Sequence, residues 1–178
     1  MTKHNKYNLF EKLIYFVLLF LAFFIQTSPY LFEYNSHVPS LILAVVMIVS
    51  FFENYWFSAI FGLFGGLLLD TVTVNNSGFH ALLYMLTALV CSIVMDAFFN
   101  NNFASFAVLS VPVIVLHQFF EIISKSGFVS GIFTLFYNHY LLVATYTFVS
   151  AFILYLFFRF ILKKYERFKK PKGIIKKK

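Results

Sequence analysis

The sequence has few charged residues and only one cysteine. Charged residues make up 12% of its 178 residues, whereas 61% are apolar and 27 are phenylalanine. Soluble proteins average about 25% charged residues, and a water-soluble globule could not keep this much apolar surface out of solvent. Cys91, the single cysteine, excludes a disulfide framework and a cysteine-based zinc site. The composition therefore predicts a protein of the lipid bilayer, with Cys91 packed inside it as a small apolar residue.

The sequence also lacks the patterns that mark common enzymes. It contains no G-x-S-x-G motif, no Walker loop, no nucleotide-binding glycine pattern and no H-E-x-x-H zinc motif. It offers no nucleophile and base pair of the kind a small intramembrane enzyme needs. We therefore expect no enzymatic activity and no cofactor.

Basic residues are almost missing from the middle of the chain. Of 14 Lys and Arg residues, three precede residue 13 and ten follow residue 158, which leaves only Lys125 between them. The net charge of +7 does not indicate nucleic acid, because these residues sit at the ends of an apolar chain and do not alternate with exposed aromatics. Their placement is typical of cytoplasmic anchors that contact anionic lipids.

Apolar segments predict an all-α membrane protein, a bundle of about six transmembrane helices. The stretch 38–69 would be about 48 Å long as one helix, against a hydrocarbon core of about 30 Å, so we divide it at Glu53 and Asn54. We expect one domain, residues 1–162, followed by a basic cytoplasmic tail, residues 163–178. The expected spans are about 13–29, 38–52, 55–70, 79–98, 103–123 and 140–162.

The distribution of Lys and Arg predicts the orientation. Six spans place both termini on one side, and thirteen of the fourteen basic residues lie on that side, which makes it the cytoplasm. Residues 30–37, 70–78 and 124–139 then lie outside. The segment 128–137 is too short to span and is either re-entrant or interfacial.

A glycine pattern marks the third span. Gly62, Gly66 and Asp70 recur every four residues and share one helix face, with Gly65 beside them. In lipid, a G-x-x-x-G spacing lets two helix backbones approach closely. We expect this face to pack against another helix, either of the same chain or of a partner.

Asp70 ends this face at the predicted outer boundary. The following residues form a turn, in which Gly78 can adopt left-handed backbone geometry. Asp70 can cap the fourth span or accept hydrogen bonds from the turn. An ionisable residue at a membrane boundary is equally a candidate functional site, and both interpretations stay open.

Three further polar residues form a candidate outer polar cluster. His117 and Glu121 are four residues apart on the fifth span, and the predicted topology places His80 on the same outer side. Imidazole and carboxylate groups suit a zinc or proton site. Two such residues on one helix are common by chance, so we favour a hydrogen-bonded polar cluster or a partner contact and predict no metal.

The run from Gly66 to Tyr84, GLLLDTVTVNNSGFHALLY, resembles the signature of the MreD family of rod-shape-determining membrane proteins. Gln26, Thr27 and Pro39 at the ends of the first two spans add to the resemblance, whose specific part covers residues 59–85. Many family members have an acidic or amide residue after this proline, whereas this chain has Ser40. No role is carried over to that position.

The resemblance implies a non-enzymatic scaffold subunit of the machinery that elongates the peptidoglycan wall. Such a subunit associates with MreC and, through MreC, with the MreB filament, RodA and a class B penicillin-binding protein. The family fold is similar to the substrate-binding subunits of energy-coupling-factor vitamin transporters. Within this implied role, Gly62, Gly65, Gly66, Asp70 and Gly78 are the candidate residues for helix packing or partner contact.

The alternative function is a substrate-capture subunit of such a vitamin transporter. The size, the six spans and the polar residues near the outer side suit a vitamin pocket. Those subunits dock through small-residue A-x-x-x-A faces on the first span, whereas Ala22 is the only alanine of that span here. This difference counts against transport.

Overall fold

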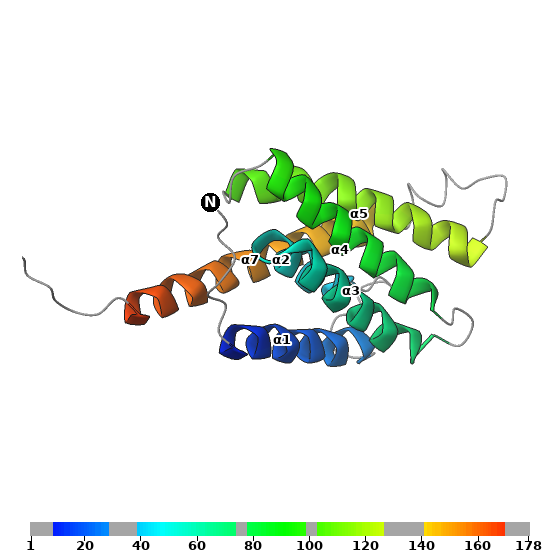
Figure 1. Cartoon of the computed structure of the whole chain (residues 1–178). Coiled ribbons are helices and arrows are strands. Elements are labelled where there is room, and N and C mark those ends of the chain that lie inside the picture. The colour runs from blue at the N-terminus through cyan, green and yellow to red at the C-terminus, as the bar shows by residue number, and fades with distance from the viewer. Residues whose placement is uncertain (1–8, 29–38, 74–77, 99–102, 127–140, 170–178) are drawn as a thin grey trace, which may run out of the picture.

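The computed structural model describes residues 9–28, 39–73, 78–98, 103–126 and 141–169, and these ranges contain helices and no strands. The prediction of an all-α membrane bundle is confirmed for this part of the chain. Figure 1 shows its helices, which are α1 (Leu9–Thr27), α2 (Leu41–Phe52), α3 (Tyr55–Asp70), α4 (Phe79–Phe98), α5 (Phe103–Ser126) and α7 (Leu141–Lys169).

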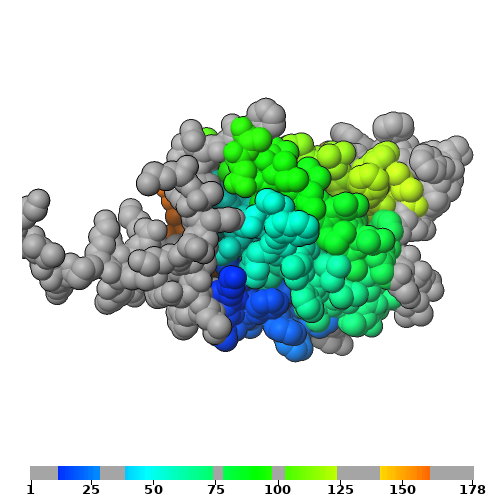
Figure 2. Space-filling model, viewed as in Figure 1, coloured from blue at the N-terminus to red at the C-terminus, as the bar shows by residue number. Residues whose placement is uncertain are grey.

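Helix α2 is the central element. All of its residues from Ile42 to Phe51 are buried, because α1, α3, α4 and α7 pack around it. Its sequence, LILAVVMIVSFF, is apolar almost all round, as expected for a helix enclosed by others. On the face shown in Figure 2, α1, α3 and α4 form neighbouring bands across the surface.

The start of α2 is held by side chains of two other helices. Ser40, its N-cap residue, makes no capping hydrogen bond to its own helix. Instead, the backbone N–H of Ser40 donates to Oγ1 of Thr147 in α7 over 3.0 Å, and the N–H of Ile42 donates to Oε1 of Gln26 in α1, also over 3.0 Å. The first amides of a helix lack intrahelical partners, and a hydrocarbon interior offers none. These two bonds therefore hold the N-terminal end of α2 against α1 and α7.

Three helical segments of the described chain are long and apolar enough to cross a membrane, namely Phe79–Ala97, Phe103–Ile123 and Leu141–Phe160. The apolar parts of the other helices are shorter. Helix α2, with 12 residues, is about 18 Å long and α3, with 16 residues, about 24 Å, each less than the hydrocarbon thickness of about 30 Å. The chain turns between them at Glu53 and Asn54, where the sequence predicts the break.

Some helix ends differ from the predicted spans. Helix α7 continues to Lys169, past the predicted end at 162, and α5 continues to Ser126. The predicted spans end where the apolar run ends. Lys, Arg and Glu have high helix propensity, so α7 can continue as a helix beyond that point. Helix α2 begins at Leu41, after Pro39. The predicted segment 128–137 and residues 170–178 of the predicted tail lie outside the described residues.

Candidate functional site

The glycine face of α3, formed by Gly62 and Gly66, lies directly against the backbone of α4. A Cβ atom added to Gly66 would lie 2.2 Å from the carbonyl oxygen of His80 and 2.4 Å from Cα of Ala81. A Cβ atom on Gly62 would lie 2.5 Å from the carbonyl oxygen of Tyr84. These distances leave no room for a side chain, so the two backbones approach as the G-x-x-x-G spacing allows. The helix at this face belongs to the same chain.

The other two glycines of the predicted set have different surroundings. Gly65 faces the core, where an added Cβ would meet side-chain methyl groups of Ile42, Leu19 and Val46 at 3.2–3.3 Å. Gly78 has a φ angle of +86°, and no atom of the described residues outside its own chain neighbours lies within 4 Å of an added Cβ. Its predicted part in helix packing or partner contact stays a prediction. Gly78 serves the turn before α4, because L-residues with side chains rarely adopt this φ.

Asp70 connects the end of α3 to the start of α4. Its Oδ1 accepts a hydrogen bond from the backbone N–H of His80 over 3.2 Å, and its Oδ2 accepts one from the N–H of Ala81 over 3.0 Å. Nδ1 of His80 lies 2.8 Å from Oδ1, so the Nδ1–H tautomer donates a third bond. A carboxylate at a helix N-terminus satisfies free amides and complements the helix dipole. We call Asp70, His80 and Ala81 the α3–α4 clasp.

The clasp is buried, which increases the importance of its hydrogen bonds. The side chains of His80 and Asp70 are 2% and 7% exposed. Unpaired amides and carboxylates are costly where water is excluded. The clasp and the glycine face therefore hold α3 and α4 together as one unit, with Gly66 one turn before Asp70.

The candidate outer polar cluster divides into two pairs. His80 pairs with Asp70 in the clasp. His117 lies 4.0 Å from Glu121 through Nδ1 and Oε2, and its ring meets the ring of Tyr84 edge-on with centroids 4.8 Å apart. Within the described residues, no group of three or more His, Cys, Asp or Glu side chains could hold a metal ion. Whether the cluster contacts a partner stays a prediction.

Sequence reasoning missed a buried hydrogen-bond network next to these pairs. The hydroxyl groups of Ser40 and Tyr84 lie 2.9 Å apart, and Ser40 is also bonded to Thr147. Tyr84 and Thr147 are fully buried. The sequence feature that could have predicted this network is the presence of polar residues, including Gln26, near the predicted outer ends of otherwise apolar spans. Their partners are 16 to 107 residues away in the chain.

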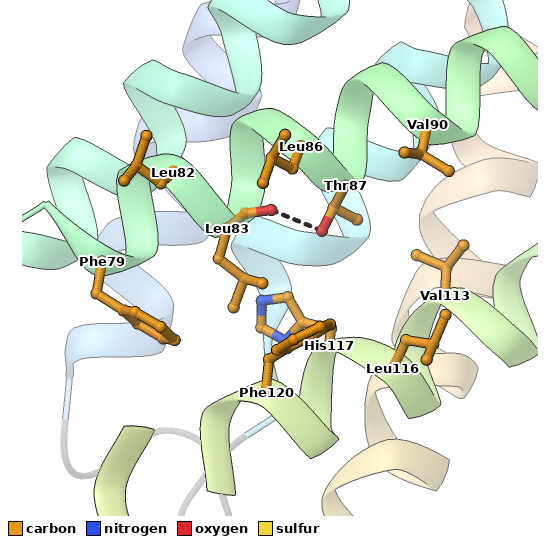
Figure 3. Close-up of a pocket in the computed structure, with 10 residues that line it drawn as sticks. All are labelled: Phe79, Leu82, Leu83, Leu86, Thr87, Val90, Val113, Leu116, His117 and Phe120. Atoms are coloured by element: carbon orange, nitrogen blue, oxygen red, sulfur yellow. Dashed lines mark hydrogen bonds between the residues drawn. The ribbon is translucent and has the colours of Figure 1, made fainter. Parts of the chain in front are cut away.

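A groove of about 390 Å³ runs between α4 and α5. Helix α4 contributes Phe79, Leu82, Leu83, Leu86, Thr87 and Val90, and α5 contributes Val113, Leu116, His117 and Phe120. Figure 3 shows the His117 side chain extending from α5 toward α4 among these apolar neighbours. The Thr87 hydroxyl donates to the carbonyl oxygen of Leu83 in its own helix. The groove therefore presents hydrocarbon surface and one imidazole, which suits binding of an apolar group.

Comparison with known proteins identifies the family. The family of the rod shape-determining protein MreD matches residues 6–165. No curated protein and no solved structure matches the chain. The family match contains all the described glycines, the clasp and the groove, and it covers most of the sequence. The chain therefore belongs to the MreD family of rod shape-determining membrane proteins.

Proposed function

We propose that this protein is a non-enzymatic scaffold subunit of the bacterial elongation complex that directs peptidoglycan synthesis and cell shape. In this role it binds an MreC-like partner and, through that partner, an MreB-like filament, RodA and a class B penicillin-binding protein. The observation that carries the proposal is the family match over residues 6–165. The apolar helices and the absence of a recognisable catalytic motif in the sequence are in keeping with a protein that acts by holding others.

The α3–α4 unit supports a scaffold role. A scaffold must present its contact surfaces in a fixed arrangement, and close backbone packing together with a buried three-bond clasp restricts the relative motion of α3 and α4. Because α4 already covers Gly62 and Gly66, a partner helix would have to displace α4 to reach them. In this proposal the glycine face contributes to partner binding indirectly, by setting the positions of α3 and α4.

The proposed orientation follows the charge distribution. The protein crosses the cell membrane several times with both termini in the cytoplasm, because the Lys and Arg residues gather near the two ends of the sequence. The basic C-terminal residues contact anionic lipids of the inner leaflet. Asp70, His80, His117 and Glu121 then lie toward the outer side of the membrane.

The experiment that tests the function is co-purification from native membranes with mass spectrometry of proteins and small molecules. Wild-type protein should recover an MreC-like partner. The Gly66→Leu variant should remain in the membrane and lose this partner, because the leucine forces α4 away from α3. Gly65→Ala is the matched control and should keep the partner. A tightly bound vitamin, without a cell-wall assembly protein, would instead support the substrate-capture function.

A further inference from the structure

Helices α1 and α3 lie side by side, parallel and in register. Nζ of Lys12 lies 4.8 Å from the centre of the Phe57 ring, and the centroids of the Phe16 and Phe61 rings lie 5.4 Å apart. In both pairs the α3 residue follows its α1 partner by 45 positions. We give the name α1–α3 flank to the exposed side chains of α1 from Leu13 to Phe24 together with those of α3 from Tyr55 to Leu67.

The apolar parts of both helices end at matching levels. The charged pair Glu11 and Lys12 ends the apolar run of α1. A lysine can lengthen such a run by extending its ammonium toward water, but the ammonium of Lys12 lies over Phe57, near the start of α3. At the other end, Thr27 closes the apolar segment of α1 and Asp70 closes that of α3. The flank therefore has one common height.

This height is smaller than the thickness of a bilayer core. The apolar segments Lys12–Thr27 and Tyr55–Asp70 each have 16 residues, so each is about 24 Å long. Any tilt of the helices would lower the height further. A hydrocarbon core is about 30 Å thick, so the flank falls short of it by roughly 6 Å.

Helix α5 does not share this shortfall. Its apolar segment, Phe103–Ile123, has 21 residues and is about 31 Å long, close to the thickness of the core. Val108 on this segment is 61% exposed, so α5 also presents apolar surface to its surroundings. The apolar belt of the protein is therefore lower at the α1–α3 flank than at α5.

The residue types of the flank favour lipid over a partner helix as its neighbour. In a bilayer, helices associate closely through small residues, as Gly62 and Gly66 do with α4. The described side chains that are exposed on the flank are all Leu, Val, Ile, Phe, Tyr or Trp. Tyr55 and Trp56, which are 40% and 64% exposed, stand at the end of the flank where α3 begins. Such aromatic residues are enriched at the level of lipid head groups.

We propose that the α1–α3 flank binds a thinned layer of phospholipid and selects lipids with short acyl chains. A bilayer thicker than the apolar height would bury the polar ends of the flank in hydrocarbon, so the lipid beside it becomes thinner. Lipid beside α5 needs no such adjustment. The proposal concerns lipid and does not depend on the MreC-like partner, so either proposal can fail without the other.

The test is quenching of Trp56 fluorescence by brominated lipid. Trp56 is the only tryptophan in the sequence, so the purified wild-type protein needs no added probe. It is reconstituted with brominated phosphatidylcholine and one unbrominated phosphatidylcholine, whose chains have about 14, 18 or 22 carbons. Recovery of fluorescence measures how well the unbrominated lipid competes for contact with the flank. The shortest lipid should compete about threefold better than the middle one, and the longest should compete worst.

The matched control moves the reporter to α5. In the double variant Trp56→Phe and Val108→Trp, the middle lipid should compete best, because the apolar height of α5 matches an ordinary core. The same chain-length preference at positions 56 and 108, or no preference at position 56, would overturn the proposal. Failure of brominated lipid to quench Trp56 would indicate that a second copy of the chain covers the flank, and would also overturn it. If the double variant does not fold, the preference at Trp56 in the wild-type protein decides the question.

Discussion

Replacing Gly66 with alanine should destabilise the protein far more than the same change at its neighbour Gly65. The two residues are adjacent on α3, and both are buried. They differ in what a new methyl group meets, which is the backbone of α4 at Gly66 and the tips of Leu19, Ile42 and Val46 side chains at Gly65. Side-chain tips can move by a few tenths of an ångström, whereas a helix backbone must move as a whole.

The expected size of the effect follows from the distances. Ordinary van der Waals contact begins near 3.4 Å, and a Cβ on Gly66 would lie 2.2 Å from the carbonyl oxygen of His80, so α4 must shift by roughly 1.2 Å. Such overpacking costs about 1–3 kcal/mol. The same shift stretches the clasp bonds, now 2.8–3.2 Å long, and each broken hydrogen bond to a charged group costs about 1.5–3 kcal/mol more. We expect a loss of about 3 kcal/mol or more for Gly66→Ala and a change within about 1 kcal/mol for Gly65→Ala.

The assay is reversible unfolding of the purified protein in mixed micelles, followed by helix content as denaturing detergent increases. Gly62→Ala should fall between the other two variants, because its Cβ would lie 2.5 Å from the carbonyl oxygen of Tyr84. Equal unfolding free energies for Gly65→Ala and Gly66→Ala would refute the reasoning. That result would mean that α3 and α4 are not packed backbone to backbone.

Three other perturbations have defined outcomes. Asp70→Asn keeps the shape of the side chain but removes its charge and one acceptor oxygen, so it should lower the unfolding free energy by about 1–2 kcal/mol. Asp70→Leu should lower the unfolding free energy further. Equal losses for the two variants would show that the hydrogen bonds of Asp70 contribute little. Reporter domains fused before Lys3 and after Lys178 should both report the cytoplasm, and opposite compartments would indicate an odd number of spans. Truncation after Lys164 should leave an inserted, folded protein, since each basic residue near an anionic surface adds about 1 kcal/mol of membrane attraction without specifying the fold. Failure of the truncated chain to insert would contradict this expectation.

Local patterns in the sequence predict the features that depend on local physics. The apolar runs indicate the helices, and the polar pair Glu53 and Asn54 marks the turn between α2 and α3. The spacing of Gly62 and Gly66 predicts a face for close helix packing. The end of α7 could not be predicted in this way, because the apolar run ends at the predicted membrane boundary, whereas the helix continues to Lys169.

The partners of the polar residues could not be predicted from the sequence. A glycine face specifies close approach but not which helix approaches, so α4 and a partner protein fit the pattern equally well. Asp70 and His80 are ten residues apart, and their contact depends on α3 and α4 packing against each other. Ser40 and Thr147 are 107 residues apart. Their contact exists only because α7 packs beside α2, which no local pattern encodes.

The central claim is that this chain maintains cell shape as a membrane scaffold, and cell shape after depletion tests it most directly. Depletion in the native host should turn rod-shaped or elongated cells into wider, rounder cells. Expression of wild type or Gly65→Ala should restore their shape. Gly66→Leu should fail to do so while still reaching the membrane. Unchanged shape after complete depletion, or full restoration by Gly66→Leu with α4 displaced from α3, would contradict the account.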